Sequence, residues 1–128
     1  MNVPVTLLYG GLTALLVVLL GLNVTRLRME ERVSSSQPIP PELRRPWRAH
    51  GNAAEWIPLG IVLLLTLELS GRVPRFPLHL LGGSFLLARV LHATGLLTRW
   101  RLGALGAGLN YLVLAVMALL ALWFRFTT

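Results

Sequence analysis

Two long stretches without a charged residue limit what this chain can fold into, Val3 to Val24 and Leu102 to Phe124. At about 1.5 Å per residue, each is long enough to cross the roughly 30 Å of hydrocarbon in a membrane as a single helix. With 55% hydrophobic residues and a mean hydropathy of +0.67, the 128-residue chain is also too apolar for a soluble domain of its size. We therefore expect an integral membrane protein.

Two further spans lie between these stretches, and both carry polar residues. Phe76 to Leu97 contains Arg89 and two histidines and is predicted to be the third helix. Trp56 to Leu67 is free of charge but too short to cross alone, so the polar residues before it must belong to the same helix. The predicted fold is all-α: one four-span membrane domain over residues 1–128, with helices at about 3–28, 42–70, 76–98 and 101–125. Because the last two connectors are short, we expect an up-down bundle.

The positive charge is distributed unevenly between the two ends of this bundle. The formal charge of +7 comes from arginines that lie between apolar runs, where they set membrane topology, so no nucleic acid partner is predicted. The first and third connectors have eight arginines beside them: Arg26, Arg28, Arg32, Arg44, Arg45, Arg48, Arg99 and Arg101. The opposite side has three: Arg72, Arg75 and Arg125. The excess predicts that the two connectors face the cytoplasm and that both termini are non-cytoplasmic.

A polar stripe occupies the first half of the second helix. At 100° per residue, Arg45, Arg48, Asn52 and Glu55 fall within about 80° of one another. Only one acid is available to this stripe although several arginines surround it. The surplus positive charge predicts an anionic ligand.

Other polar residues are expected at a similar depth. Arg89 and His92 share a face of the third helix, and Glu55 and Arg89 are predicted to form an ion pair, because unpaired charges inside a membrane are costly. Such a pair could equally serve only to brace the two helices. Arginines also close the first helix and open the fourth on this side, so one pocket could gather from all four helices.

Several kinds of site are not indicated. The chain has no cysteine, so any thiol chemistry must use a thiol supplied by a substrate. The histidines lack the spacing of metal ligands, and no metal site is predicted. The glycine-rich run Gly103 to Asn110 is typical of close helix packing in a membrane. Glu68 and Arg72 are spaced as a surface ion pair.

Two motifs resemble those of the MAPEG family, the membrane-associated proteins of eicosanoid and glutathione metabolism. They are R-x-x-R-A-H-G-N-A-A-E-W-x-P-L from Arg45 to Leu59 and R-x-x-H-A-x-G-L from Arg89 to Leu96. The run L-N-V-T-R-L-R from Leu22 to Arg28 is similar to the end of that family's first helix, and the closer likeness is to small bacterial members. Gly51 and Leu96 depart from the residues of some eicosanoid-synthesising members, so prostaglandin synthesis is not implied.

The resemblance implies a homotrimer in a bacterial inner membrane, with glutathione bound between subunits near the cytoplasmic face. It implies a glutathione-dependent transferase or peroxidase that acts on a lipophilic electrophile or hydroperoxide from the surrounding lipid. By motif, Arg48, Asn52, Glu55 and His92 would contact glutathione, Arg26 would come from the neighbouring first helix, and Arg89 would hold Glu55. Arg101, or alternatively Arg99, would approach the sulfur and favour the thiolate.

Two other functions compete with this one. The family also contains a non-catalytic scaffold that presents lipid, so the chain could bind lipid without turnover. A small four-span exporter would require a membrane-embedded acid in the first helix, and residues 1–25 contain none.

Overall fold

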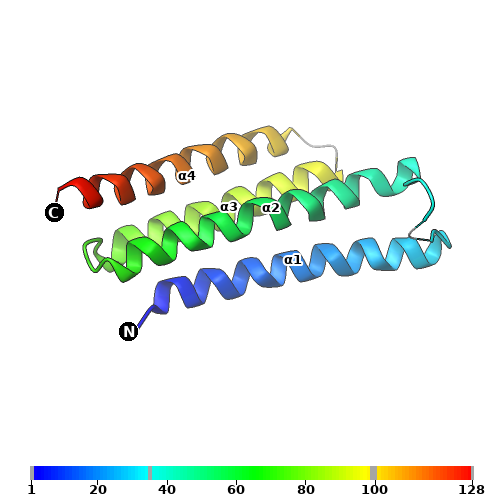
Figure 1. The fold of residues 1–128 in the computed structure, drawn as a ribbon. Coiled ribbons are helices and arrows are strands. Elements are labelled where there is room, and N and C mark those ends of the chain that lie inside the picture. The colour runs from blue at the N-terminus through cyan, green and yellow to red at the C-terminus, as the bar shows by residue number, and fades with distance from the viewer. Residues whose placement is uncertain (1, 35, 99–100, 128) are drawn as a thin grey trace.

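The computed structural model describes residues 2–34, 36–98 and 101–127, and these form four long α-helices (Figure 1). The helices are α1 (Pro4–Glu30), α2 (Pro41–Leu69), α3 (Arg75–Thr98) and α4 (Leu102–Phe126). Their bounds lie close to those predicted, and all four are long and apolar enough to cross a membrane. The all-α, four-span prediction is confirmed.

The four helices run up and down, with α2 and α3 between α1 and α4 (Figure 1). Both termini lie at one end of the molecule, and the connections α1 to α2 and α3 to α4 lie at the other. Within the described part of the chain, α1 packs on α2 and α3, and α4 packs on α3 and α2, but α1 and α4 do not touch. Within one chain, α2 and α3 therefore lie between α1 and α4.

Glycines bring α3 and α4 together at the end that carries the connections. A Cβ added to Gly95 would lie 2.2 Å from the backbone nitrogen of Gly103, and one added to Gly106 would lie 2.4 Å from that of His92. No side chain larger than hydrogen fits at either position. The expectation that the glycine-rich run allows close helix packing is confirmed.

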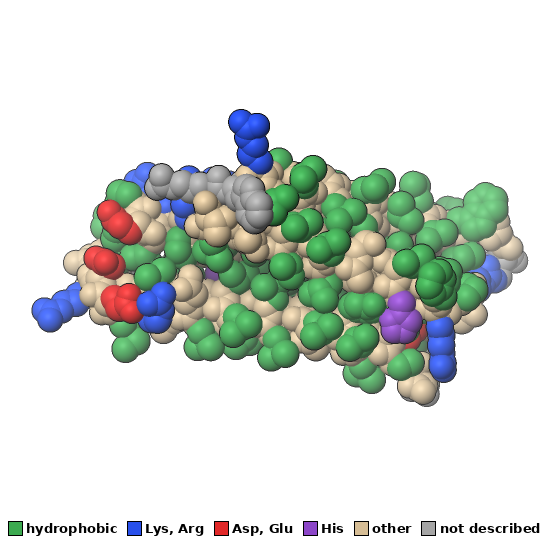
Figure 2. All heavy atoms as spheres, turned by 180° about the vertical axis from the view of Figure 1, so that it is seen from behind, with side chains coloured by type: hydrophobic (Ala, Val, Ile, Leu, Met, Phe, Trp, Pro, Cys, Tyr) green, Lys and Arg blue, Asp and Glu red, His purple; other side chains and the backbone are tan. Residues whose placement is uncertain are grey.

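The helices bury one apolar face and leave another exposed along their length. Leu64, Phe85 and Met117 are each 1% exposed in the core, whereas Leu15 and Leu19 on α1 are more than half exposed. On the face drawn in Figure 2, apolar side chains cover most of the middle of the molecule, and most charged side chains lie toward its ends. This distribution suits hydrocarbon around the middle and headgroups at both ends.

At the end that carries the termini, Glu68 of α2 caps the start of α1. Its carboxylate accepts the backbone N–H groups of Val5 at 2.9 Å and Thr6 at 2.7 Å. Because α1 has no N-terminal side-chain cap of its own, this contact satisfies two of its free donors. The predicted pairing of Glu68 with Arg72 is wrong, since Arg72 donates to the carbonyl oxygen of Phe124 at 3.0 Å.

Candidate functional site

The polar stripe of α2 lines a pocket of about 260 Å³ on the surface of the chain. Arg48, Asn52 and Glu55 all contribute to it, because their spacing places them on one face of the helix. The remaining lining residues are Trp47 and Gly51. Three of the four residues of the predicted stripe thus line one pocket, whereas Arg45 is not among the lining residues.

The charged groups of this pocket are open to a ligand. Arg48 and Glu55 are both exposed, and among the described residues neither has a hydrogen-bond or ion-pair partner. The pocket therefore offers a cation, an amide and an anion in succession along one helix face. Exposed, unpaired charges on a helix that crosses a membrane are expensive, and they are a sign of a ligand, water or another subunit at that surface.

Arg89 of α3 lies behind this pocket and is 1% exposed. One terminal nitrogen donates to Asn52 Oδ1 at 2.5 Å and the other to Asn110 Oδ1 of α4 at 3.3 Å, while Nε has no partner within the described residues. The predicted ion pair between Glu55 and Arg89 is therefore wrong within one chain. Asn52 faces α3, whereas Glu55, roughly 60° further around the helix, remains on the exposed side.

His92 of α3 forms a hydrogen bond to the backbone at the start of α4. Its Nδ1 lies 2.9 Å from the carbonyl oxygen of Gly103 and must donate, because a carbonyl oxygen only accepts. In the tautomer that has its proton on Nδ1, Nε2 is an acceptor. Arg101 lies two residues before Gly103, exposed at the start of α4, and neither His92 nor Arg101 lines the α2 pocket of the same chain. Arg99, the alternative to Arg101, lies outside the described residues.

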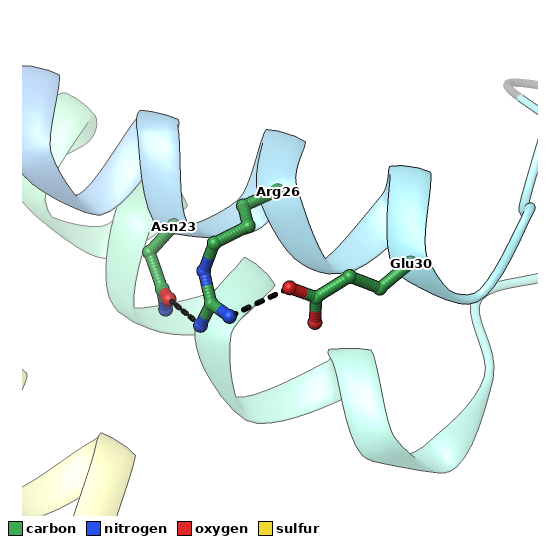
Figure 3. Close-up of polar contacts among 3 residues, drawn as sticks. All are labelled: Asn23, Arg26 and Glu30. Atoms are coloured by element: carbon green, nitrogen blue, oxygen red, sulfur yellow. Dashed lines mark hydrogen bonds and ion pairs between the residues drawn. The ribbon is translucent and has the colours of Figure 1, made fainter.

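Arg26 of α1 is exposed and bonded within its own helix. It donates to Glu30 at 2.8 Å and to Asn23 at 3.1 Å (Figure 3). It does not line the α2 pocket of its own chain. If Arg26 contacts a ligand in that pocket, the arginine must come from another subunit.

Three residues of this region were not predicted from the sequence to belong to a site. Trp47 lines the pocket and carries the guanidinium of Arg28 4.6 Å from its ring centroid, a cation–π contact that joins α1 to α2. Arg28 had been assigned only to topology. Asn110 is the third, and its presence as an amide in the charge-free run Leu102 to Phe124 was the signal that could have revealed it.

Comparison with known proteins identifies the family of this chain. The sequence profile of the MAPEG family matches residues 6–123, which include parts of all four helices. The chain belongs to the MAPEG family. The resemblance inferred from the two motifs is thus confirmed, and a MAPEG member with four spans is an integral membrane protein.

Relatives of this MAPEG protein occur in Escherichia coli. The inner membrane protein YecN of strain K12 is 37% identical over 123 residues, which cover 94% of this chain and 92% of the relative. YecN of strain O6:H1 CFT073 matches to the same extent. The name of these relatives states a membrane location and no reaction.

Proposed function

We propose that this MAPEG protein is a glutathione-dependent transferase or peroxidase that acts on a lipophilic electrophile or hydroperoxide. The observation that carries the proposal is the α2 pocket, where Arg48, Asn52 and Glu55 offer a cation, an amide and an anion, and neither charge is paired with another described residue. Glutathione carries two carboxylates and one ammonium group, so it can match both signs. Arginine binds carboxylates with planar, charge-assisted hydrogen bonds.

In this proposal, the remaining residues of the site are brought to the pocket when subunits assemble. All described residues that line the α2 pocket belong to α2, and this supports a homotrimer in which a neighbouring subunit closes each site. Arg26 of that neighbour would reach the ligand, and His92 would offer Nε2 as an acceptor. In this proposal the sites lie near the cytoplasmic face of a bacterial inner membrane, and both termini face away from the cytoplasm.

The chemical step would depend on an arginine beside the sulfur. A free thiol titrates at about 8.5, and a guanidinium close to it lowers that pKa and favours the nucleophilic thiolate. We assign this role to Arg101, which is exposed at the start of α4. The thiolate would then attack an electrophilic carbon with loss of the leaving group. With a hydroperoxide it would attack oxygen, and a second glutathione would complete the reduction to alcohol, water and glutathione disulfide.

The experiment is a titration of the detergent-purified protein with glutathione, in which thiolate absorbance is followed in the ultraviolet. We expect saturable binding with a thiolate signal, and loss of that signal in Arg101→Ala. If the protein neither binds glutathione nor gives a thiolate signal, the proposed enzymatic function is wrong. A signal that survives in Arg101→Ala would instead move the activating role to Arg99.

A lipid-binding or scaffold protein without turnover is the second candidate. It is favoured by an apolar groove of about 530 Å³ along the last turns of α4. The groove is lined by Val116, Leu119, Leu120, Leu122, Trp123 and Phe126. A scaffold of this kind would give no thiolate signal in the same titration, whatever lipid the groove holds.

A further inference from the structure

Asn110 is a buried amide on α4 for which the proposed chemistry has no use. It is 2% exposed and lies in a helix that carries no charge from Leu102 to Phe124. Its Oδ1 accepts from Arg89 at 3.3 Å. Burial of a polar side chain is unfavourable unless a hydrogen bond compensates for the lost hydration. Here the hydrogen-bond partner is the guanidinium of Arg89.

Arg89 connects this amide to the α2 pocket. Its two terminal nitrogens point to Asn110 on α4 and to Asn52 on α2, and no acid lies within 4 Å among the described residues. The guanidinium is a rigid plane, so a bond at one terminal nitrogen restricts the direction of the other. Asn110 therefore limits how Arg89 can meet Asn52.

The contact decides which end of Asn52 the ligand meets. A guanidinium has donors and no acceptor, so Asn52 must turn Oδ1 toward Arg89. Its amide nitrogen then points away from Arg89. Because Asn52 also lines the pocket, the group available to a ligand there is a donor. If the amide were reversed, an oxygen would face a bound carboxylate and repel it.

We propose that Asn110 is a positioning residue: from α4 it holds Arg89, and Arg89 holds Asn52 with its amide nitrogen toward the ligand. The part of this proposal that concerns ligand affinity depends on the proposed function, since the ligand is taken to be glutathione. The part that concerns the orientation of Asn52 does not. The two parts can be measured separately.

The side-chain amides give a direct readout, because the chain has only four asparagines, Asn2, Asn23, Asn52 and Asn110. The full chain would be labelled with ¹⁵N-asparagine, and its side-chain amide signals would be recorded in detergent micelles. The matched variants are Asn110→Val and Asn110→Thr. Valine and threonine have nearly the same shape, but only threonine has a hydroxyl oxygen that can accept a hydrogen bond from Arg89. We expect the Asn52 signal to shift and broaden in Asn110→Val and to stay nearer its original position in Asn110→Thr. Asn23→Ala, which removes an acceptor from the exposed Arg26, should leave the Asn52 signal unchanged.

Glutathione affinity of the same variants tests the second part. Loss of one aligned hydrogen bond to a charged ligand predicts an affinity about tenfold lower in Asn110→Val, with partial recovery in Asn110→Thr. In the unmodified protein, glutathione should shift the amide signal of Asn52 more than that of Asn110, a comparison that does not depend on the folding of any variant.

The outcomes separate the proposals. An Asn52 signal that is the same in Asn110→Val as in the unmodified protein would overturn the positioning role. A shifted signal with unchanged glutathione affinity would overturn its link to the ligand. If the unmodified protein binds no glutathione, the proposed function fails, while the Asn52 signal still decides whether Asn110 positions the amide.

Discussion

Glu55 and Glu68 belong to the same helix, α2, and have different surroundings. Both carboxylate oxygens of Glu68 accept hydrogen bonds from backbone N–H groups at the start of α1. Glu55 is exposed in the pocket beside Asn52, without an ion-pair partner among the described residues. The first carboxylate therefore contributes to the stability of the fold, and the second is available to a ligand.

Replacement of these two glutamates should have opposite effects. Glu68→Ala removes the cap of α1 and is expected to lower the free energy of unfolding by about 1 kcal/mol, while glutathione affinity stays the same. Glu55→Gln should leave stability unchanged and weaken glutathione binding about tenfold, because the ammonium group loses its counter-charge. Thermal unfolding in detergent and calorimetric titration would measure the two quantities. Weaker binding in Glu68→Ala, or full binding in Glu55→Gln, would contradict the division of roles.

At the scale of the elements, the contact between α3 and α4 depends on residues without side chains. A Cβ on Gly106 would meet the backbone of His92 and lie 2.8 Å from the carbonyl oxygen of Ala88. A Cβ on Gly108, two residues further along the same helix, would have no neighbouring atom within 4 Å. Backbone atoms cannot rotate out of the way as a side chain can, so the first clash can be relieved only if the helices separate.

The two glycines provide a matched pair of substitutions. Gly106→Ala should destabilise the protein by about 1–3 kcal/mol, the usual effect of overpacking. Gly108→Ala should be neutral or slightly stabilising, because alanine has the higher helix propensity. The free energy of unfolding can be measured for both in mixed detergent micelles. Equal stability of the two variants would show that α3 and α4 are not in close contact.

At the scale of the whole molecule, an apolar band separates two polar ends (Figure 2). The end with the two connections carries the larger share of the arginines, and the end with both termini carries the smaller share. Arginine beside a span is retained in the cytoplasm during insertion. This difference in charge supports the proposed orientation, in which both termini face away from the cytoplasm.

The orientation can be tested by cysteine labelling, because the chain contains no native cysteine. Thr127→Cys should react with a membrane-impermeant maleimide that reaches only the non-cytoplasmic side of an intact inner membrane. Ser36→Cys should react only after the membrane is permeabilised. Both positions are exposed, so access of the reagent is limited by the membrane alone. The reverse pattern of labelling would overturn the proposed topology.

Assembly makes a separate prediction at this scale. If Arg26 of one subunit completes the pocket of its neighbour, subunits with Arg26→Ala and subunits with Glu55→Gln should complement each other. In trimers mixed at equal amounts, about a quarter of the sites should contain both intact residues, and high-affinity glutathione binding should return to that level. If both variants bind weakly and the mixed trimers bind no better than either, Arg26 does not complete the pocket of a neighbouring subunit. Full binding in Arg26→Ala alone would place Arg26 outside the site.

Several features of this protein could be predicted from the sequence because they depend on neighbours along the chain. The length of an apolar run determines whether a helix can cross a membrane, and helical periodicity determines that Arg48, Asn52 and Glu55 share a face. The motifs that surround them were sufficient to indicate the MAPEG family.

The partners of the buried polar groups could not be predicted in this way. Arg89 meets Asn52 and Asn110 instead of Glu55, and Glu68 meets α1 instead of Arg72. The lack of contact between the described residues of α1 and α4 could not be predicted either.

The sequence by itself thus determined the four spans, the stripe on α2 and the family. Only the tertiary structure decided which groups meet across helices. The physical reason is that helix formation and burial in lipid depend on local composition, whereas a contact between helices depends on their relative rotation and distance, and these are set by packing at small residues such as Gly95 and Gly106.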